Sequence, residues 1–141
     1  MSESTKYEFC GHDWIAVARE FIEQRAEGAD LTGINVTFNE VFTDPPAQLD
    51  PEGLGKIGWY LRIADNRIEV SPGVLAEADV RATVDYQMVL SAARRLSTDP
   101  PLDEEAQKAL AASIQREGDA SVLGGLKWLS GLHDVMAVRT L

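Results

Sequence analysis

Hydrophobic residues near the start of the chain recur with the period of a helix. The apolar positions follow the i, i+3, i+4 spacing of one helix face: Trp14, Val17, Ala18, Phe21 and Ile22. Asp13 stands where an N-cap is expected, and Gly28 follows the last periodic position. We therefore predict an amphipathic helix over residues 14–27, with one side against an apolar surface.

Four later segments alternate hydrophobic and polar residues with a period of two, as strands with one buried face do. They are residues 34–42, 57–64, 67–70 and 78–84. Asp65-Asn66 lies between the second and third segments and predicts a two-residue hairpin turn. Val36 and Phe38 then face inward on the first strand. The inward positions of the second and fourth strands include Trp59, Leu61, Val80, Ala82 and Val84.

The rest of the chain adds helices and one more strand. Asp85 is expected to cap a helix that extends to Leu96, and a shorter helix is expected to begin near Asp103. A fifth strand is predicted over residues 112–117, and a last helix from about Asp119. The order helix, four strands, two helices, strand, helix predicts an α+β fold with a five-stranded, mostly antiparallel sheet covered by helices. At this length we expect one domain, residues 1–141.

The last predicted helix is apolar on more than one face and contains interior glycines. Its apolar residues include Leu123, Leu126, Leu129 and Leu132, and its glycines are Gly124, Gly125 and Gly131. Two explanations stay open. The helix could shelter an apolar ligand in a cavity beneath it, or the glycines could allow close approach to the sheet.

The segments "WYLRIADNRIEVSPG" and "ADVRATVDYQMVLSAARRL", followed by a short strand that ends in "EGD" and an apolar final helix, resemble the sterol carrier protein type 2 family. The resemblance covers nearly the whole chain. It implies a lipid-binding domain with an apolar cavity under the C-terminal helix. It also implies a non-catalytic carrier for a fatty acid, acyl thioester, sterol or related lipid.

We expect the ligand to contact the inward positions of the strands and the apolar positions of the last helix. These candidates are Trp59, Leu61, Val80, Ala82, Val84, Ile114, Arg116, Leu123, Leu126, Leu129 and Leu132. Arg116 is the polar member, because period two sends it inward if Ile114 faces inward on a strand. It would then receive a ligand carboxylate or phosphate. The alternative is that the short strand lies at a sheet edge and Arg116 reaches solvent or an acidic side chain.

Charge and composition exclude several partners. The chain has 23 acidic residues against 13 Lys and Arg, a formal net charge of −10, and no basic cluster, so we expect no nucleic-acid partner. No apolar run approaches the roughly 18 residues that span a bilayer, and the start has no secretory signal pattern, so we expect a cytoplasmic protein without stable membrane insertion. Cys10, the single cysteine, fits a reducing compartment.

No catalytic or metal motif is complete. Ser130, His133 and Asp134 lack the flanking glycines of a hydrolase elbow, and adjacent residues on a helix point in different directions. Two histidines and one cysteine give no metal-ligand spacing, so neither a metal nor a cofactor is predicted. The alternative to a carrier is a small pocket enzyme, an isomerase or hydratase acting on a hydrophobic substrate through inward Asp or His residues.

Overall fold

The computed structural model describes residues 5–129 and 131–141, without the side chains of residues 120 and 122–125. The elements in chain order are α1 (His12–Glu27), β1 (Val36–Thr43), η2 (Ala47–Leu49), β2 (Lys56–Ala64), β3 (Arg67–Pro72), β4 (Val80–Asp85), α2 (Tyr86–Ala93), α3 (Glu104–Ser113), β5 (Gln115–Gly118), η3 (Ala120–Leu129) and α4 (Leu132–Ala137). Apart from the short η2 and the division of the last helix into η3 and α4, this is the predicted order of helices and strands, and it confirms an α+β fold.

The five strands form one mixed sheet in the order β3-β2-β1-β4-β5. Neighbouring strands are antiparallel except β1 and β4, which run parallel. In this register Glu40 of β1 lies opposite Trp59 of β2 on one side and Ala82 of β4 on the other. These three residues therefore share one face of the sheet.

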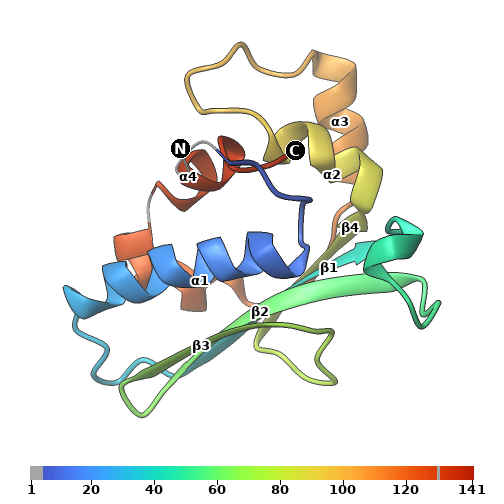
Figure 1. Cartoon of the computed structure of the whole chain (residues 1–141). Helices are drawn as coiled ribbons and strands as arrows, with labels where there is room; N and C mark the ends of the chain where they lie inside the picture. Colours follow the sequence, from blue (N-terminus) through green and yellow to red (C-terminus); the bar gives the residue numbers. More distant parts are fainter. Residues whose placement is uncertain (1–4, 130) are drawn as a thin grey trace.

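Helices cover that face. Figure 1 shows α1 lying across the sheet, with α4 beyond it and α2 beside β4. The buried side of α1 consists of Trp14, Ile15, Ala18 and Ile22. The aromatic rings of Phe9, Trp14, Phe42 and Tyr86 pack beneath the helices near the start of α1. The hydrophobic core thus lies between the sheet and one layer of helices.

The two ends of the described chain are joined to each other and to the core. Tyr7 pairs with Thr140 in an isolated parallel bridge. The indole Nε1 of Trp14 donates a hydrogen bond of 3.0 Å to the Thr140 hydroxyl, which itself donates to the Met136 carbonyl at 2.6 Å. The C-terminal segment is therefore part of the core, because Thr140 is buried with its hydroxyl satisfied.

Local polar signals fix several element ends. Asp65 and Asn66 both have positive φ, +53° and +61°, which confirms the two-residue hairpin turn. The Asp85 carboxylate accepts a hydrogen bond from the Met88 backbone N–H, and Asp103 accepts one from that of Ala106. Both predicted N-caps are confirmed.

Other predicted ends were wrong. Asp13 lies inside α1, and Gly11 is the N-cap without a side-chain hydrogen bond. Helix α3 continues to Ser113, so β5 begins at Gln115 and Ile114 is the residue between them rather than a strand position. The last helix is interrupted, because Leu126 has non-helical dihedral angles and Gly131 adopts the left-handed conformation at φ +94°.

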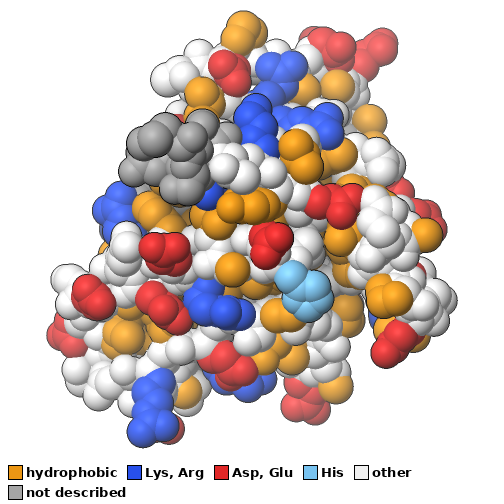
Figure 2. Space-filling view, in the orientation of Figure 1, with side chains coloured by type: hydrophobic (Ala, Val, Ile, Leu, Met, Phe, Trp, Pro, Cys, Tyr) orange, Lys and Arg blue, Asp and Glu red, His pale blue; other side chains and the backbone are white. Residues whose placement is uncertain are grey.

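The surface of the described residues mixes charges of both signs. Figure 2 shows acidic and basic side chains interspersed on the visible face, with hydrophobic side chains between them. Within the described residues, no helix is both long enough and apolar enough to cross a bilayer.

Candidate functional site

A cavity of about 480 Å³ lies between the sheet and the helices. Side chains from α1, α2, η3 and α4 form its roof, and β1 and β2 form its floor. The lining residues are Phe9, Trp14, Ala18, Phe38, Glu40, Trp59, Leu61, Val89, Ala92, Ala93, Leu126, Leu129, Leu132, His133 and Met136. Apart from Glu40 and His133 the described lining residues are apolar or aromatic, which is the usual character of a small-molecule site.

Glu40 stands in the floor of this cavity. Its carboxylate Oε1 accepts a hydrogen bond of 2.7 Å from the indole Nε1 of Trp59, the residue opposite it in the antiparallel pair. The Glu40 side chain lies deep in the protein but is only half-buried, because part of it faces the cavity. Glu40 is therefore held by the protein on one oxygen and accessible from the cavity.

Burial shifts the ionisation of this group. Loss of solvation raises the pKa of the Glu40 carboxyl above its ordinary value, since the charged form is disfavoured away from water. The hydrogen bond from Trp59 and the charges of His133 and Arg116 act in the opposite direction and reduce the rise. The protein thus favours the neutral acid at this position more than water does.

His133 also lines the cavity but is exposed. Its Nε2 lies 2.6 Å from the backbone carbonyl of Arg95. A carbonyl only accepts, so Nε2 carries a proton and donates to it. This bond connects the first turn of α4 to the residues that follow α2.

The structure brings together part of the predicted ligand-binding set. Trp59, Leu61, Leu126, Leu129 and Leu132 line the cavity. The side chain of Leu123 lies outside the described part of the structure. Ligand contact at all these positions stays a prediction.

The remaining predicted residues lie outside the lining. Val80 and Val84 are buried and Ala82 is half-buried on the covered face, but none of them borders the cavity. Ile114 is partly buried against the core. Sheet register explains their exclusion, because β4 and β5 lie beyond β1, whereas the cavity lies over β1 and β2.

Arg116 is exposed on β5, which is an edge strand. It lies opposite Ala82, in the same row as Glu40, but its side chain does not line the cavity. The premise that Ile114 precedes it on the strand was wrong, and an edge position lets the guanidinium reach solvent. Its charge still contributes to lowering the pKa of Glu40.

Glu40 was missed by the sequence analysis, although a signal for it exists. The alternation that places Val36 and Phe38 inward continues to residue 40, so the next inward side chain is a carboxylate. The contribution of α2 was also missed. Its apolar face supplies Val89, Ala92 and Ala93 to the cavity. Helical periodicity identifies the apolar face of α2 but does not show whether that face borders a cavity or packs against other side chains.

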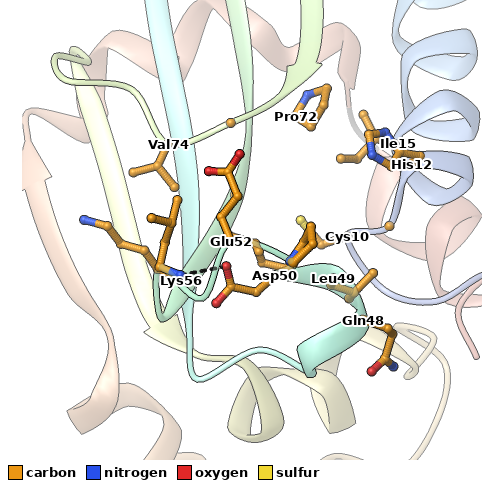
Figure 3. A pocket seen from close by; sticks show the side chains of 16 residues that line it. Cys10, His12, Ile15, Gln48, Leu49, Asp50, Glu52, Lys56, Pro72 and Val74 are labelled. Carbon is orange, nitrogen blue, oxygen red and sulfur yellow. Dashed lines mark hydrogen bonds between the residues drawn. The ribbon is translucent and has the colours of Figure 1, made fainter.

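A second hollow, of about 430 Å³, lies beside the first turn of α1 (Figure 3). Polar side chains from the loop between β1 and β2 gather at its rim, among them Gln48, Asp50 and Glu52. The Asp50 carboxylate accepts hydrogen bonds from the backbone N–H groups of Leu54 and Gly55 at 2.9 and 2.8 Å. The Asp50 carboxylate therefore stabilises the loop between β1 and β2. The apolar cavity is the better candidate for a ligand-binding site.

Two solved structures share this fold along nearly the whole chain. A Thermus thermophilus protein, described as conserved, hypothetical and a candidate sterol carrier protein, is 18% identical, with a TM-score of 0.56 over 98% of this chain and 94% of its own. A crystal structure of sterol carrier protein 2 is 13% identical, with a TM-score of 0.57 over 92% and 98%. No protein-family model and no curated protein matches the sequence. The chain has the fold of sterol carrier protein 2, as the sequence resemblance implied.

Proposed function

We propose that this protein binds an apolar small molecule, such as a fatty acid, acyl thioester, sterol or related lipid, in the cavity under its C-terminal helices and acts as a non-catalytic carrier. The observation that carries the proposal is the lining of the cavity. Thirteen of the fifteen lining side chains that the structure describes are hydrophobic, and the volume of about 480 Å³ lies in the range of small-molecule sites.

The fold agrees with this proposal. The Thermus thermophilus protein named above is described as a candidate sterol carrier protein, and the crystal structure is of sterol carrier protein 2. Leu126, Leu129 and Leu132 come from the short helices that close one side of the cavity. Gly131 lies between these helices in the left-handed conformation, and a change of its backbone angles would move α4 without unfolding α1 or the sheet.

A pocket enzyme would need a proton donor and acceptor positioned on one substrate. Glu40 and His133 are the two titratable groups of the described lining. In the described structure Nε2 of His133 is engaged with the Arg95 carbonyl, which leaves Glu40, with one oxygen bound by Trp59, as the group of this pair that is open to the cavity. This arrangement favours binding over proton transfer.

The experiment that tests the proposal is native mass spectrometry of the protein purified from its own host, followed by organic extraction of what it carries. A thermal-shift series with fatty acids, acyl thioesters, sterols and long-chain alcohols accompanies it. A ligand that binds only the folded protein adds about 2.7 kcal/mol at a hundredfold excess over Kd. We expect a co-purifying lipid and a rise in melting temperature for at least one class. The proposal is wrong if no lipid is extracted and no class shifts the melting temperature.

A further inference from the structure

The apolar cavity contains a carboxyl group with unused hydrogen-bonding capacity. Oε1 of Glu40 accepts the indole N–H of Trp59 at 2.7 Å. Within the described residues, Oε2 has no hydrogen-bond partner, and the side chain borders the cavity. A polar group enclosed by apolar side chains is costly unless it is hydrogen-bonded, so an occupant of the cavity that meets this oxygen gains an interaction.

Trp59 holds the carboxyl in a fixed position. The indole packs edge-to-face against the rings of Trp14 and Phe38, with centroids 6.2 and 6.3 Å away. Only 5% of the Trp59 surface is exposed. Because the donor cannot swing away, Glu40 presents Oε2 in one direction, and a ligand would not have to order the side chain when it binds.

The chemistry of the carboxyl selects among head groups. A ligand hydroxyl accepts a hydrogen bond from the neutral acid and donates one to the ionised form, so it matches Glu40 in either state. A ligand carboxylate matches only the neutral acid, and an ammonium group is attracted chiefly by the charge of the ionised form. The nearby positive charge of Arg116, and of His133 when protonated, further disfavours an ammonium group.

We propose that Glu40 is the head-group site of the cavity and binds the hydroxyl of an otherwise apolar ligand. The proposal rests on the proposed function and narrows it to a class of ligand. The hydrocarbon part of that ligand would lie along the apolar lining, against Leu61 of β2 and against Leu126 and Leu129 of η3.

The test compares two ligands of equal heavy-atom number, 1-dodecanol and tridecane, by the change in the protein's tryptophan fluorescence, to which Trp14 and Trp59 of the cavity lining contribute together with Trp128. Three variants are titrated beside the native protein. Glu40→Gln keeps a donor and an acceptor at this position, Glu40→Met removes both, and Glu105→Gln removes a charge from the exposed side of α3. We expect native protein to bind dodecanol about tenfold more tightly than tridecane, the scale of one net hydrogen bond.

We expect Glu40→Gln and Glu105→Gln to keep most of this preference and Glu40→Met to reduce it to about twofold or less. Equal binding of both ligands by native protein, or an undiminished preference in Glu40→Met, overturns the head-group site but leaves the carrier function standing. No binding of either ligand overturns both.

A measurement on the native protein covers the case in which Glu40→Met does not fold. The infrared band of the Glu40 carboxyl group, that of the neutral acid or of the carboxylate according to its state at the pH used, is identified by its loss in Glu40→Gln. It should shift when dodecanol binds and stay in place with tridecane. The same band position with both bound ligands contradicts the proposal.

Discussion

Glu40 and Trp59 face each other across two antiparallel strands, and the Trp59 indole N–H donates to the Glu40 carboxylate at 2.7 Å. The pair joins the one acidic side chain among the described lining residues of the cavity to an aromatic residue of the core. Because the carboxyl is removed from water, its pKa is raised, and the hydrogen bond from Trp59 limits the rise. Stability should therefore depend on the ionisation of Glu40.

Replacing Glu40 by Gln should change the pH dependence of stability. The folded protein binds the Glu40 proton more tightly than the unfolded chain does, so this group stabilises fully below its unfolded pKa, about 4.3. The contribution is lost as pH rises through the raised folded pKa. We expect the unfolding free energy of native protein to fall relative to Glu40→Gln as pH rises above about 4 and then to level off. Urea titrations across this range measure the difference. Stability curves of native protein and Glu40→Gln that stay parallel would contradict the raised pKa.

Replacing Trp59 by Phe should move that pH window upward. The variant keeps a ring at the position but removes the N–H that stabilises the Glu40 carboxylate, so the pKa of Glu40 should rise further. The readout is the pH at which the infrared band of the neutral acid disappears. The smaller Phe ring also loses packing contacts, which lowers total stability. Lost packing alone does not shift the titration midpoint of Glu40 in one particular direction. A midpoint that is unchanged or lower in Trp59→Phe would show that the hydrogen bond from Trp59 does not lower the pKa of the Glu40 carboxyl.

Asn39 should be essential to the stability of the sheet on the face opposite the cavity. It is fully buried, its Nδ2 donates to the carbonyls of Trp59 and Gly73 at 2.8 and 3.1 Å, and its Oδ1 accepts the Leu75 N–H at 2.9 Å. Asn39→Leu should cost about 1–3 kcal/mol for each group left without a partner. Hydrogen exchange at the Leu75 amide should accelerate in this variant.

The matched control for Asn39 is Val41→Ala. Val41 is buried on the same face of β1, and its truncation leaves no polar group without a partner. It should lower stability without changing the protection of the Leu75 amide relative to its neighbours. If the two variants alter exchange at Leu75 equally, the hydrogen bond from that amide has no separate role.

Gly118 should tolerate no side chain. It has a φ of +88°, and a Cβ there would lie 1.8 Å from the backbone oxygen of Asp79, at the end of the β4–β5 pair. Gly55 has a similar φ of +80° with nothing within 4 Å of a Cβ. Gly55→Ala should therefore cost only the conformational penalty, about 1–2 kcal/mol, and Gly118→Ala clearly more. Equal melting temperatures of the two variants would show that β5 does not need its close approach to β4.

The fold was predictable where short polar signals fix the backbone. Asp85 and Asp103 each cap the helix that follows, and Asp65-Asn66 adopts the two positive φ values of its turn. These effects act within a few residues, so they can be recognised in the sequence. The parallel pairing of β1 with β4 joins residues about 40 positions apart, and hydrophobic alternation within each strand carries no signal for it.

The candidate site was predictable only in part. Alternation identifies Trp59 and Leu61 as inward positions, and both line the cavity. The same argument places Val84 inward, yet that side chain is packed into the core beside the cavity. Which inward side chains line the cavity depends on where the helices leave space above the sheet. Gly131 and Leu126 interrupt the C-terminal helix at points that the apolar pattern does not specify.

A bulky side chain inside the cavity should compete with the ligand for space. Ala93 of α2 is half-buried and lines the cavity, whereas Gln87 of the same helix is exposed. In fluorescence titrations with 1-dodecanol, Ala93→Phe should weaken binding about tenfold or more, because the added ring occupies ligand space. Gln87→Phe should bind like native protein, and circular dichroism should show both variants folded. Undiminished dodecanol binding by folded Ala93→Phe would place the ligand outside this cavity and contradict the proposed binding site.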